Sequence, residues 1–126
     1  MKPNVSVIIP TYNRADLLRG AITSVLNQTF QDFEIIVVDD ASDDHTPAVV
    51  RGFNDDRITY IRREKTGGEA KARNTGVINS RAEYIAFLDD DDEWLPEKLE
   101  LQIKLLKKCS QVVGGVYTGL IRIDRT

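Results

Sequence analysis

Hydrophobic positions along the chain fall into short apolar runs that alternate with segments in which apolar residues recur at helical spacing. The apolar runs predict strands over residues 5–9, 33–38, 58–62 and 84–88. The helical spacing predicts helices over residues 13–26, 46–53, 69–79 and 96–108. Strands that alternate with helices form parallel β-α-β units with right-handed crossovers. The pattern therefore predicts an α/β fold with a three-layer, doubly wound, mostly parallel sheet.

The ends of these elements carry further signals. Asn13 stands where an N-cap is expected, and Asp16 follows three residues later as in a capping box. Pro96 suits the first turn of the last helix. Apolar residues at 112–117 and 120–123 predict two more strand pieces. No repeat, low-complexity tract or proline-rich linker interrupts the chain, so we expect a single domain over residues 1–126.

Composition places the chain among ordinary globular proteins and limits its partners. Hydrophobic residues make up 41% of the 126 residues and charged residues 29%. The 17 basic and 20 acidic side chains give a net charge of -3 without a basic stripe, which disfavours a nucleic-acid partner and favours cations. The apolar run at residues 5–9 is too short for a signal peptide or a membrane span. We expect a cytoplasmic location, with membrane association only through a region beyond this chain.

Polar side chains follow several of the predicted strands directly. Thr11 and Tyr12 come after the first strand, Asp39 and Asp40 after the second, and the acid run Asp89–Glu93 after the strand at 84–88. Ligands of doubly wound sheets bind at the carboxyl ends of the strands. Because the chain has neither a glycine-rich dinucleotide fingerprint nor a phosphate-loop pattern, phosphate would have to be held through a metal.

The acid run poses an electrostatic problem, because the strand before it fixes its position. Like charges about 5 Å apart repel by roughly 3 kcal/mol at an effective dielectric of about 20. A helix N-terminus offsets only about 0.3 to 1 kcal/mol per charge. A divalent cation is the better explanation, and we assign Asp89 and Asp91 to Mg²⁺ or Mn²⁺. The alternative is a solvated turn plus a helix cap, in which Asp92 or Glu93 caps the helix at Pro96.

The other polar residues each have a structural alternative. Asp39 and Asp40 suit the local hydrogen bonds of a turn as well as a base edge or a ribose hydroxyl. Tyr12 could stack on a base or cover the edge of the sheet. Arg73 could lie on a solvated helix face, or reach a diphosphate because Gly67-Gly68 loosens the chain before its helix. His45 lies outside these groups and is expected at the surface.

Taken together, several blocks of sequence resemble the family 2 nucleotide-sugar glycosyltransferases of the GT-A fold. The blocks are VSVIIPTYNR at 5–14, DFEIIVVDDASD at 32–43, GEAKARNTG at 68–76 and EYIAFLDDDDEWLP at 83–96. The resemblance spans residues 5 to about 108. It implies a nucleotide-diphosphosugar donor, most often a uridine one, and a divalent metal. It also implies a role in polysaccharide or cell-wall biosynthesis. The acceptor, whether glycan, lipid or protein, and the oligomeric state are left open.

The resemblance also implies roles for residues on the nucleotide side. Pro10, Thr11 and Tyr12 match the segment that lines the base. Asp40 matches the acid that contacts the base, with Asp39 beside it. Arg73 matches the basic residue near the nucleotide.

On the metal side, Asp89-Asp90-Asp91 matches the D-x-D motif. Asp91 is then the strongest candidate for direct metal ligation, while Asp89 or Asp90 holds the ribose or a metal-bound water; we place Asp90 with the nucleotide. In the family the general base lies on a later segment that builds the acceptor site. We therefore expect this chain to be the donor half of a longer enzyme, cut at its C-terminus, which binds donor and metal yet transfers little sugar.

The sequence also allows two other functions. A nucleotidyltransferase also uses a doubly wound sheet and a metal, but it would need a glycine-rich basic loop where residues 11–14 stand. A non-catalytic module that binds divalent cations would use the acid run as its whole function.

Overall fold

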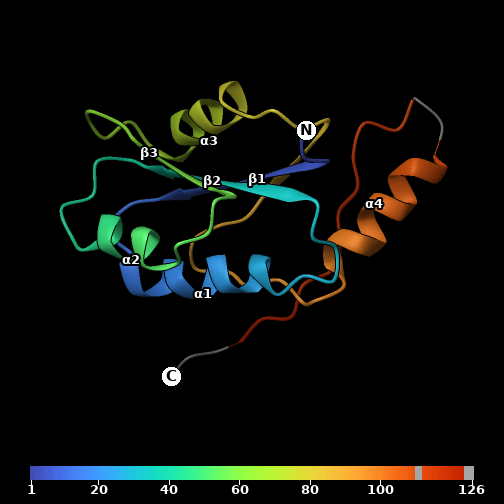
Figure 1. Cartoon of the computed structure of the whole chain (residues 1–126), viewed down its shortest axis with the longest axis horizontal. Helices are drawn as coiled ribbons and strands as arrows, with labels where there is room; N and C mark the ends of the chain where they lie inside the picture. Colours follow the sequence, from blue (N-terminus) through green and yellow to red (C-terminus); the bar gives the residue numbers. More distant parts are fainter. Residues whose placement is uncertain (110–111, 124–126) are drawn as a thin grey trace.

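The computed structural model describes residues 1–109 and 112–123. The chain forms β1 (Val5–Thr11), α1 (Ala15–Leu26), β2 (Phe33–Asp39), α2 (Thr46–Gly52), β3 (Ile58–Arg62), α3 (Glu69–Ile78), β4 (Tyr84–Phe87) and α4 (Lys98–Lys108). Figure 1 shows the sheet as a central layer, with α3 on one side and α1 and α2 on the other.

The sheet is parallel and has the strand order β3-β2-β1-β4. The chain adds β2 and β3 on one side of β1 and then crosses to place β4 on the other. The switch point therefore lies between β1 and β4, where ligands of such sheets bind at the carboxyl ends. The predicted doubly wound α/β fold is confirmed.

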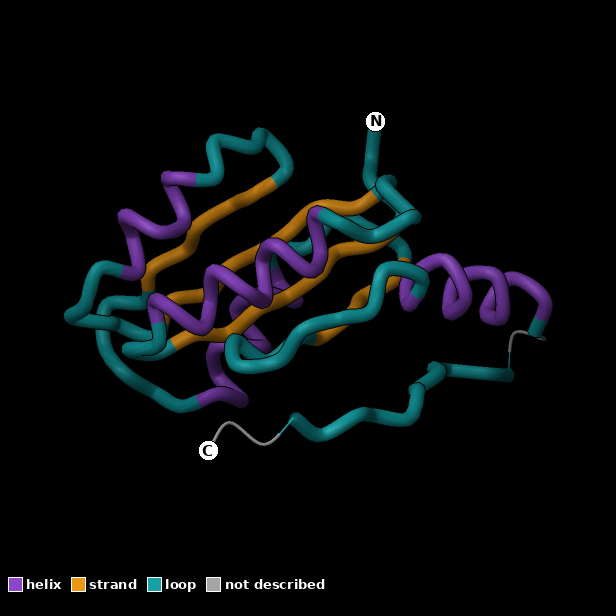
Figure 2. The backbone as a smooth tube through the Cα atoms, turned by 90° about the horizontal axis from the view of Figure 1, so that it is seen from below, coloured by secondary structure: helices purple, strands orange, loops and turns teal. Residues whose placement is uncertain are grey.

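Two apolar layers hold the helices on the sheet, because alternate residues of a strand face opposite sides. On one face, side chains of β1 and β2 pack against α1, with contributions from α2 and α4. The buried members of this layer include Val7, Ile9, Ile35, Val37, Leu18, Ile22, Val50, Leu99 and Ile103. On the other face, Ile8, Ile36 and Val38 pack with Ala72 of α3. Figure 2 shows the strands between the helices of these two layers. Burial on both faces explains why β1 and β2 read as continuous apolar runs.

The start of α1 differs from the prediction. The helix begins at Ala15 and has no capping bond from the side chain of its N-cap residue, so the Asn13–Asp16 capping box is wrong. Asn13 instead has a φ of 52°, and its side-chain oxygen accepts from the Asp43 amide at 2.9 Å. Asp44 takes over the cap, because its Oδ2 accepts from the Ala15 amide at 3.1 Å.

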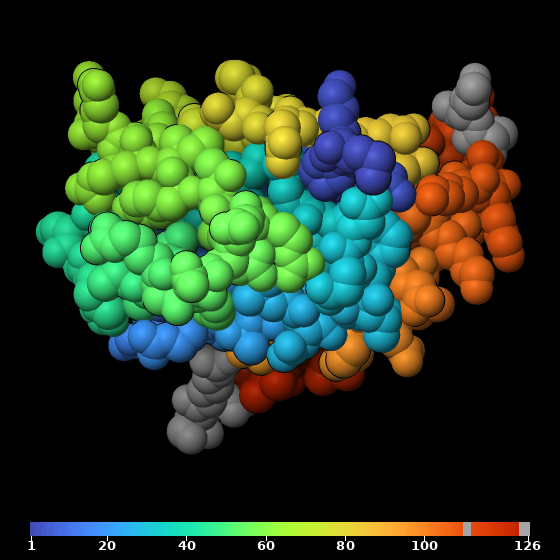
Figure 3. Space-filling model, viewed as in Figure 1, coloured from blue at the N-terminus to red at the C-terminus, as the bar shows by residue number. Residues whose placement is uncertain are grey.

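The last helix also begins later than predicted, at Lys98 instead of Pro96. The buried side chain of Gln28 explains its position. Gln28 Oε1 accepts from the Leu99 amide at 3.0 Å, and Gln28 Nε2 donates to the Leu95 carbonyl at 2.7 Å. Figures 1 and 3 show α4 at one side of the molecule, beside the segment that follows α1.

Three strand predictions need correction. The strand predicted at 84–88 is β4, an edge strand with only one neighbour among the described strands, and Phe87 is 50% exposed instead of buried. The pieces predicted at 112–117 and 120–123 do not join the sheet. Apolar side chains there, such as Tyr117 and Ile121, lie exposed, because an extended segment without a paired neighbour cannot bury them. Within the described residues no helix is both long and apolar enough to span a membrane.

Candidate functional site

The polar residues that follow separate strands meet at one rim of the sheet, as predicted. Thr11 at the end of β1 lies in register with Asp39 at the end of β2. The Asp40 amide donates to the Thr11 carbonyl at 2.9 Å. On the other side of β1, the Thr11 hydroxyl donates to Asp90 Oδ2 at 2.9 Å. The rim is therefore continuous from Asp39 across β1 to the acid run.

Asp90 is the buried member of the acid run. Its Oδ2 accepts from Thr11, and its Oδ1 lies 3.2 Å from Arg14 Nη1. Burial raises the pKa of Asp90 above its ordinary value, against the hydrogen bond from Thr11 and the charge of Arg14. Because protein groups take both oxygens, Asp90 fixes the acid run onto β1.

The remaining aspartates of the run are exposed and form a cluster. One carboxylate oxygen each from Asp89, Asp91 and Asp92 lies within 4.8 Å of the others. Arg73 Nη2 lies 2.9 Å from Asp89 Oδ1, and Arg14 Nη1 lies 3.1 Å from Asp91 Oδ2. Hard cations such as Mg²⁺ take carboxylate oxygens together with phosphate oxygens and water, so this donor set fits such an ion.

Asp92 belongs to this cluster, although the sequence assigned it only to the turn. Its amide does make the turn, donating to the Asp89 carbonyl at 3.1 Å. Burial raises the pKa of Asp92, and the charges of Asp91 and Asp89 raise it further. A signal for Asp92 was present in the sequence, since it continues the run by one more carboxylate.

Asp40 connects the end of β2 to the loop that leads into α3. Its buried carboxylate accepts from Arg63 Nη1 at 2.6 Å and from the amides of Gly67 and Gly68 at 3.1 and 2.8 Å. Gly68 has a φ of 94°, a conformation that favours glycine. Asp40 thus sets the start of the helix that carries Arg73.

Arg63 was missed by reasoning from the sequence. The signal that could have found it is its place directly after β3, on the same rim as the other polar residues. Its side chain is 20% exposed and points to Asp40, so it neutralises a carboxylate that would otherwise be buried alone.

Asp39 has no exposed surface, and its contacts are those of a local turn. Its Oδ1 accepts from the Ser42 amide at 2.8 Å, and its Oδ2 accepts from the Tyr60 hydroxyl and from Arg62 at 3.3 Å. Burial and the hydrogen bond to Asp39 raise the pKa of Tyr60 to about 12. The turn alternative is therefore realised at Asp39, while a contact of this residue with a nucleotide stays a prediction.

The residues predicted to line the base lie at the beginning of the same rim. Pro10 and Thr11 are buried in β1, and the side chain of Tyr12 directly after them is exposed. The Tyr12 ring is thus exposed directly after β1, and its stacking on a base stays a prediction.

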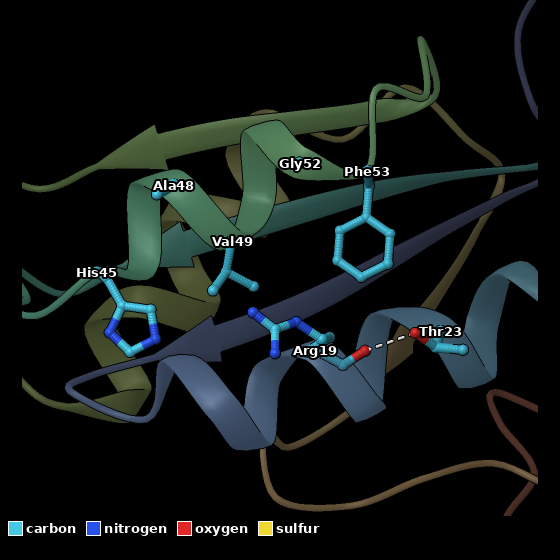
Figure 4. Close-up of a pocket in the computed structure, with 7 residues that line it drawn as sticks. All are labelled: Arg19, Thr23, His45, Ala48, Val49, Gly52 and Phe53. Atoms are coloured by element: carbon cyan, nitrogen blue, oxygen red, sulfur yellow. Dashed lines mark hydrogen bonds between the residues drawn. The ribbon is translucent and has the colours of Figure 1, made fainter.

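His45 lies at the start of α2, in a shallow groove between α1 and α2 (Figure 4). Its Nε2 lies 3.1 Å from Asp16 Oδ1, and its side chain is 57% exposed. The expectation of a surface position for His45 is confirmed.

Comparison with known proteins gives a family match over nearly the whole chain. The sequence model described as "Glycosyl transferase family 2" matches residues 6–123. One relative is the Escherichia coli UDP-Glc:alpha-D-GlcNAc-diphosphoundecaprenol beta-1,3-glucosyltransferase WfgD, which is 43% identical over 104 residues. That match covers 82% of this chain and 41% of WfgD.

Comparison with solved structures finds the same fold. S. aureus TarS 1-349 in complex with UDP-GlcNAc superimposes with a TM-score of 0.79 at 30% identity, over 83% of this chain and 31% of TarS 1-349. The mannosyltransferase PcManGT from Pyrobaculum calidifontis, in complex with GDP-Man and Mn²⁺, gives a TM-score of 0.77 at 31% identity, over 84% and 33% of the two chains. This chain therefore corresponds to less than half of each of these proteins, and its fold is that of the GT-A glycosyltransferases.

Proposed function

Because the chain belongs to glycosyl transferase family 2, we propose that it forms the donor-binding part of an enzyme that transfers sugar from a uridine diphosphosugar. WfgD is named for UDP-Glc and TarS was solved with UDP-GlcNAc, which supports a uridine donor here. The main structural support for this function is that Arg73 lies beside the exposed cluster of Asp89, Asp91 and Asp92 at the switch point of the sheet.

The nucleoside would lie along the ends of β1 and β2. Tyr12 offers an exposed ring for stacking on the base beside Pro10 and Thr11. From the end of β2, Asp40 would contact the base or ribose, while Asp39, whose carboxylate has no exposed surface, holds the turn beside it. Since Asp40 also holds the loop before α3, it would place the nucleoside and Arg73 relative to each other.

The diphosphate would lie between α3 and the acid run. Arg73 reaches over this region from α3, and its planar guanidinium can donate two parallel hydrogen bonds to phosphate oxygens. Asp89 and Asp91 would hold Mn²⁺ or Mg²⁺, and Asp90 would position the ribose side of the site. A divalent cation bound there supplies Lewis-acid stabilisation of the charge that develops on the departing diphosphate.

We further propose that the rest of a longer protein supplies the acceptor site and the general base. The chain spans 41% of WfgD and 31% of TarS 1-349, so these proteins contain much additional sequence. An acceptor hydroxyl would attack the sugar in line, with the base removing its proton. The lipid-linked sugar in the name of WfgD supports a role in polysaccharide or cell-wall biosynthesis.

Calorimetric titration of the chain with uridine diphosphate tests this function. We expect binding in Mn²⁺ or Mg²⁺ that weakens strongly when a chelator replaces the metal. A parallel titration with guanosine diphosphate tests the base, because a uridine site should bind it more weakly. Absence of nucleotide binding both with and without metal would overturn the proposal. A calcium signal that is unaffected by nucleotide would instead favour the cation-binding module.

A further inference from the structure

Arg14 connects the loop before α1 to the acid run 76 positions later. Its Nη1 lies 3.2 Å from Asp90 Oδ1 and 3.1 Å from Asp91 Oδ2. Among the residues that the structure describes, Arg14 and Arg73 supply all the ion pairs made by the acid run. The chain thus brings its own positive charges to a cluster whose members repel one another.

The two carboxylates that Arg14 contacts differ in environment. The side chain of Asp90 is 7% exposed, so its negative charge needs a partner inside the protein. The side chain of Asp91 is 46% exposed, and pairs at such exposure contribute only about 0 to 1 kcal/mol. Arg14 is therefore anchored at Asp90, while its contact with Asp91 is easily exchanged.

Arg73 is placed differently. It pairs with Asp89 at 2.9 Å and with Glu69 of its own helix at 3.4 Å, so it has no contact with Asp91 within ion-pair distance. Arg14 alone among the described residues occupies the carboxylate that the proposed function assigns most directly to the metal.

We propose that Arg14 is a tethered counter-ion of the acid run, a positioning residue that pairs with Asp91 until a divalent cation displaces it. This inference rests on the proposed metal site at Asp89 and Asp91. When the cation arrives, Arg14 keeps its bond to Asp90 and releases Asp91, so the acid run stays fixed to β1 in both states. Arg14 then lowers the affinity for free cation and disfavours a metal-loaded site before the donor arrives.

Manganese binding in the absence of nucleotide tests this role directly. The variants are Arg14→Gln and, as a matched control, Arg19→Gln, which removes the same charge from an exposed position on α1 that makes no described ion pair with the acid run. Free Mn²⁺ is measured by electron paramagnetic resonance. We expect Arg14→Gln to bind Mn²⁺ about two- to fivefold more tightly than wild type, as the loss of a weak competing pair predicts. Arg19→Gln should match wild type.

The possible results distinguish failure of the Arg14 role from failure of the proposed metal site. If wild type binds Mn²⁺ and Arg14→Gln binds it equally or more weakly, the counter-ion role is overturned while the metal site stands. If wild type binds no Mn²⁺ with or without uridine diphosphate, the metal site itself is wrong, and the inference is overturned with it.

A second measurement uses unaltered protein, so it does not depend on the variant folding. The side-chain ¹⁵N resonances of the arginines are followed by nuclear magnetic resonance during a Mg²⁺ titration. Displacement predicts that the Arg14 resonance shifts with the same saturation curve as metal binding, while that of Arg19 stays constant. A constant Arg14 resonance at saturating Mg²⁺ would contradict displacement.

Discussion

The Thr11 hydroxyl donates to Asp90 Oδ2 at 2.9 Å, although 79 positions separate the two residues. This bond joins the end of β1 to the acid run after β4, across the switch point of the sheet. The bond holds the acid run in place at Asp90, because this carboxylate is buried while the carboxylates on either side of it are exposed.

Removal of this bond should affect stability and binding together. Thr11→Val keeps the shape but leaves a buried carboxylate oxygen without its donor, and we expect a loss of about 1 to 3 kcal/mol in the free energy of unfolding. Binding of uridine diphosphate with Mn²⁺ should also weaken. The control is Thr23→Val, whose exposed hydroxyl bonds to the Arg19 carbonyl within α1. Urea unfolding and calorimetry measure both effects; equal results for the two variants would contradict the proposed link.

Asp40→Asn should loosen the loop before α3. An amide nitrogen cannot accept from Gly67 or Gly68, and the charge that neutralises Arg63 is lost. We expect a loss of about 1.5 to 3 kcal/mol in unfolding free energy. Amide hydrogen exchange at Gly67 and Gly68 should accelerate. Asp43→Asn, which changes an exposed carboxylate in the same turn, is the control and should leave this exchange unaltered.

Two glycines in helices predict contrasting effects of an added methyl group: Gly76 of α3, which packs against β1, and Gly52 at the end of α2. A Cβ at Gly76 would lie 2.4 Å from Ile8 Cγ2, so Gly76→Ala forces buried atoms apart and should cost about 1 to 3 kcal/mol. A Cβ at Gly52 meets nothing within 4 Å, and Gly52→Ala at the end of α2 should be neutral or slightly stabilising. Thermal unfolding measures both. A Gly76→Ala protein as stable as wild type would show that the described contact is not close.

Glu34 predicts a pH dependence at the opposite end of the sheet. Burial alone would raise its pKa, but hydrogen bonds from Ser6 and Arg81 outweigh it and hold the pKa below its ordinary value. Its contribution is therefore complete above the unfolded pKa of about 4.3 and is lost as the pH falls through the lower folded pKa. Glu34→Gln should destabilise the protein by about 2 kcal/mol at neutral pH.

The same variant should lose this disadvantage in acid. Chemical unfolding from pH 7 to pH 3 should show the difference between wild type and Glu34→Gln shrinking below the unfolded pKa, because the unfolded carboxylate then takes up a proton before the folded one does. The exposed Glu83→Gln provides the control for removal of one carboxylate. A difference that stays constant over this range would contradict the assigned role of the charge.

Features that depend on local sequence were predicted well. The runs that became β1 and β2 are continuous in apolar residues because both faces of these strands are covered. The rim of polar residues followed from the rule that parallel strands present their carboxyl ends together, and the structure brings Thr11 and Asp90 into contact there.

Features that depend on distant partners were predicted poorly. The cap of α1 comes from Asp44 and the cap of α4 from Gln28, and no local pattern around either helix reveals such donors and acceptors. The same reason explains why Arg63 and the role of Arg14 as partner of the acid run were missed. Residues 112–123 carry a strand-like pattern, yet such a pattern becomes a strand only when a neighbouring strand pairs with it.

In the proposed site, Asp91 holds a metal ion, and that ion holds the diphosphate of the nucleotide. The most direct measurement is the affinity for uridine diphosphate with Mn²⁺ and with chelator, in wild type and Asp91→Ala, with Asp43→Ala as control. We expect Mn²⁺ to tighten binding by about tenfold or more in wild type and Asp43→Ala, a gain of about 1.4 kcal/mol. Asp91→Ala should fold with equal or greater stability and show no such gain. An equal gain from Mn²⁺ in Asp91→Ala would contradict the metal-binding role of Asp91.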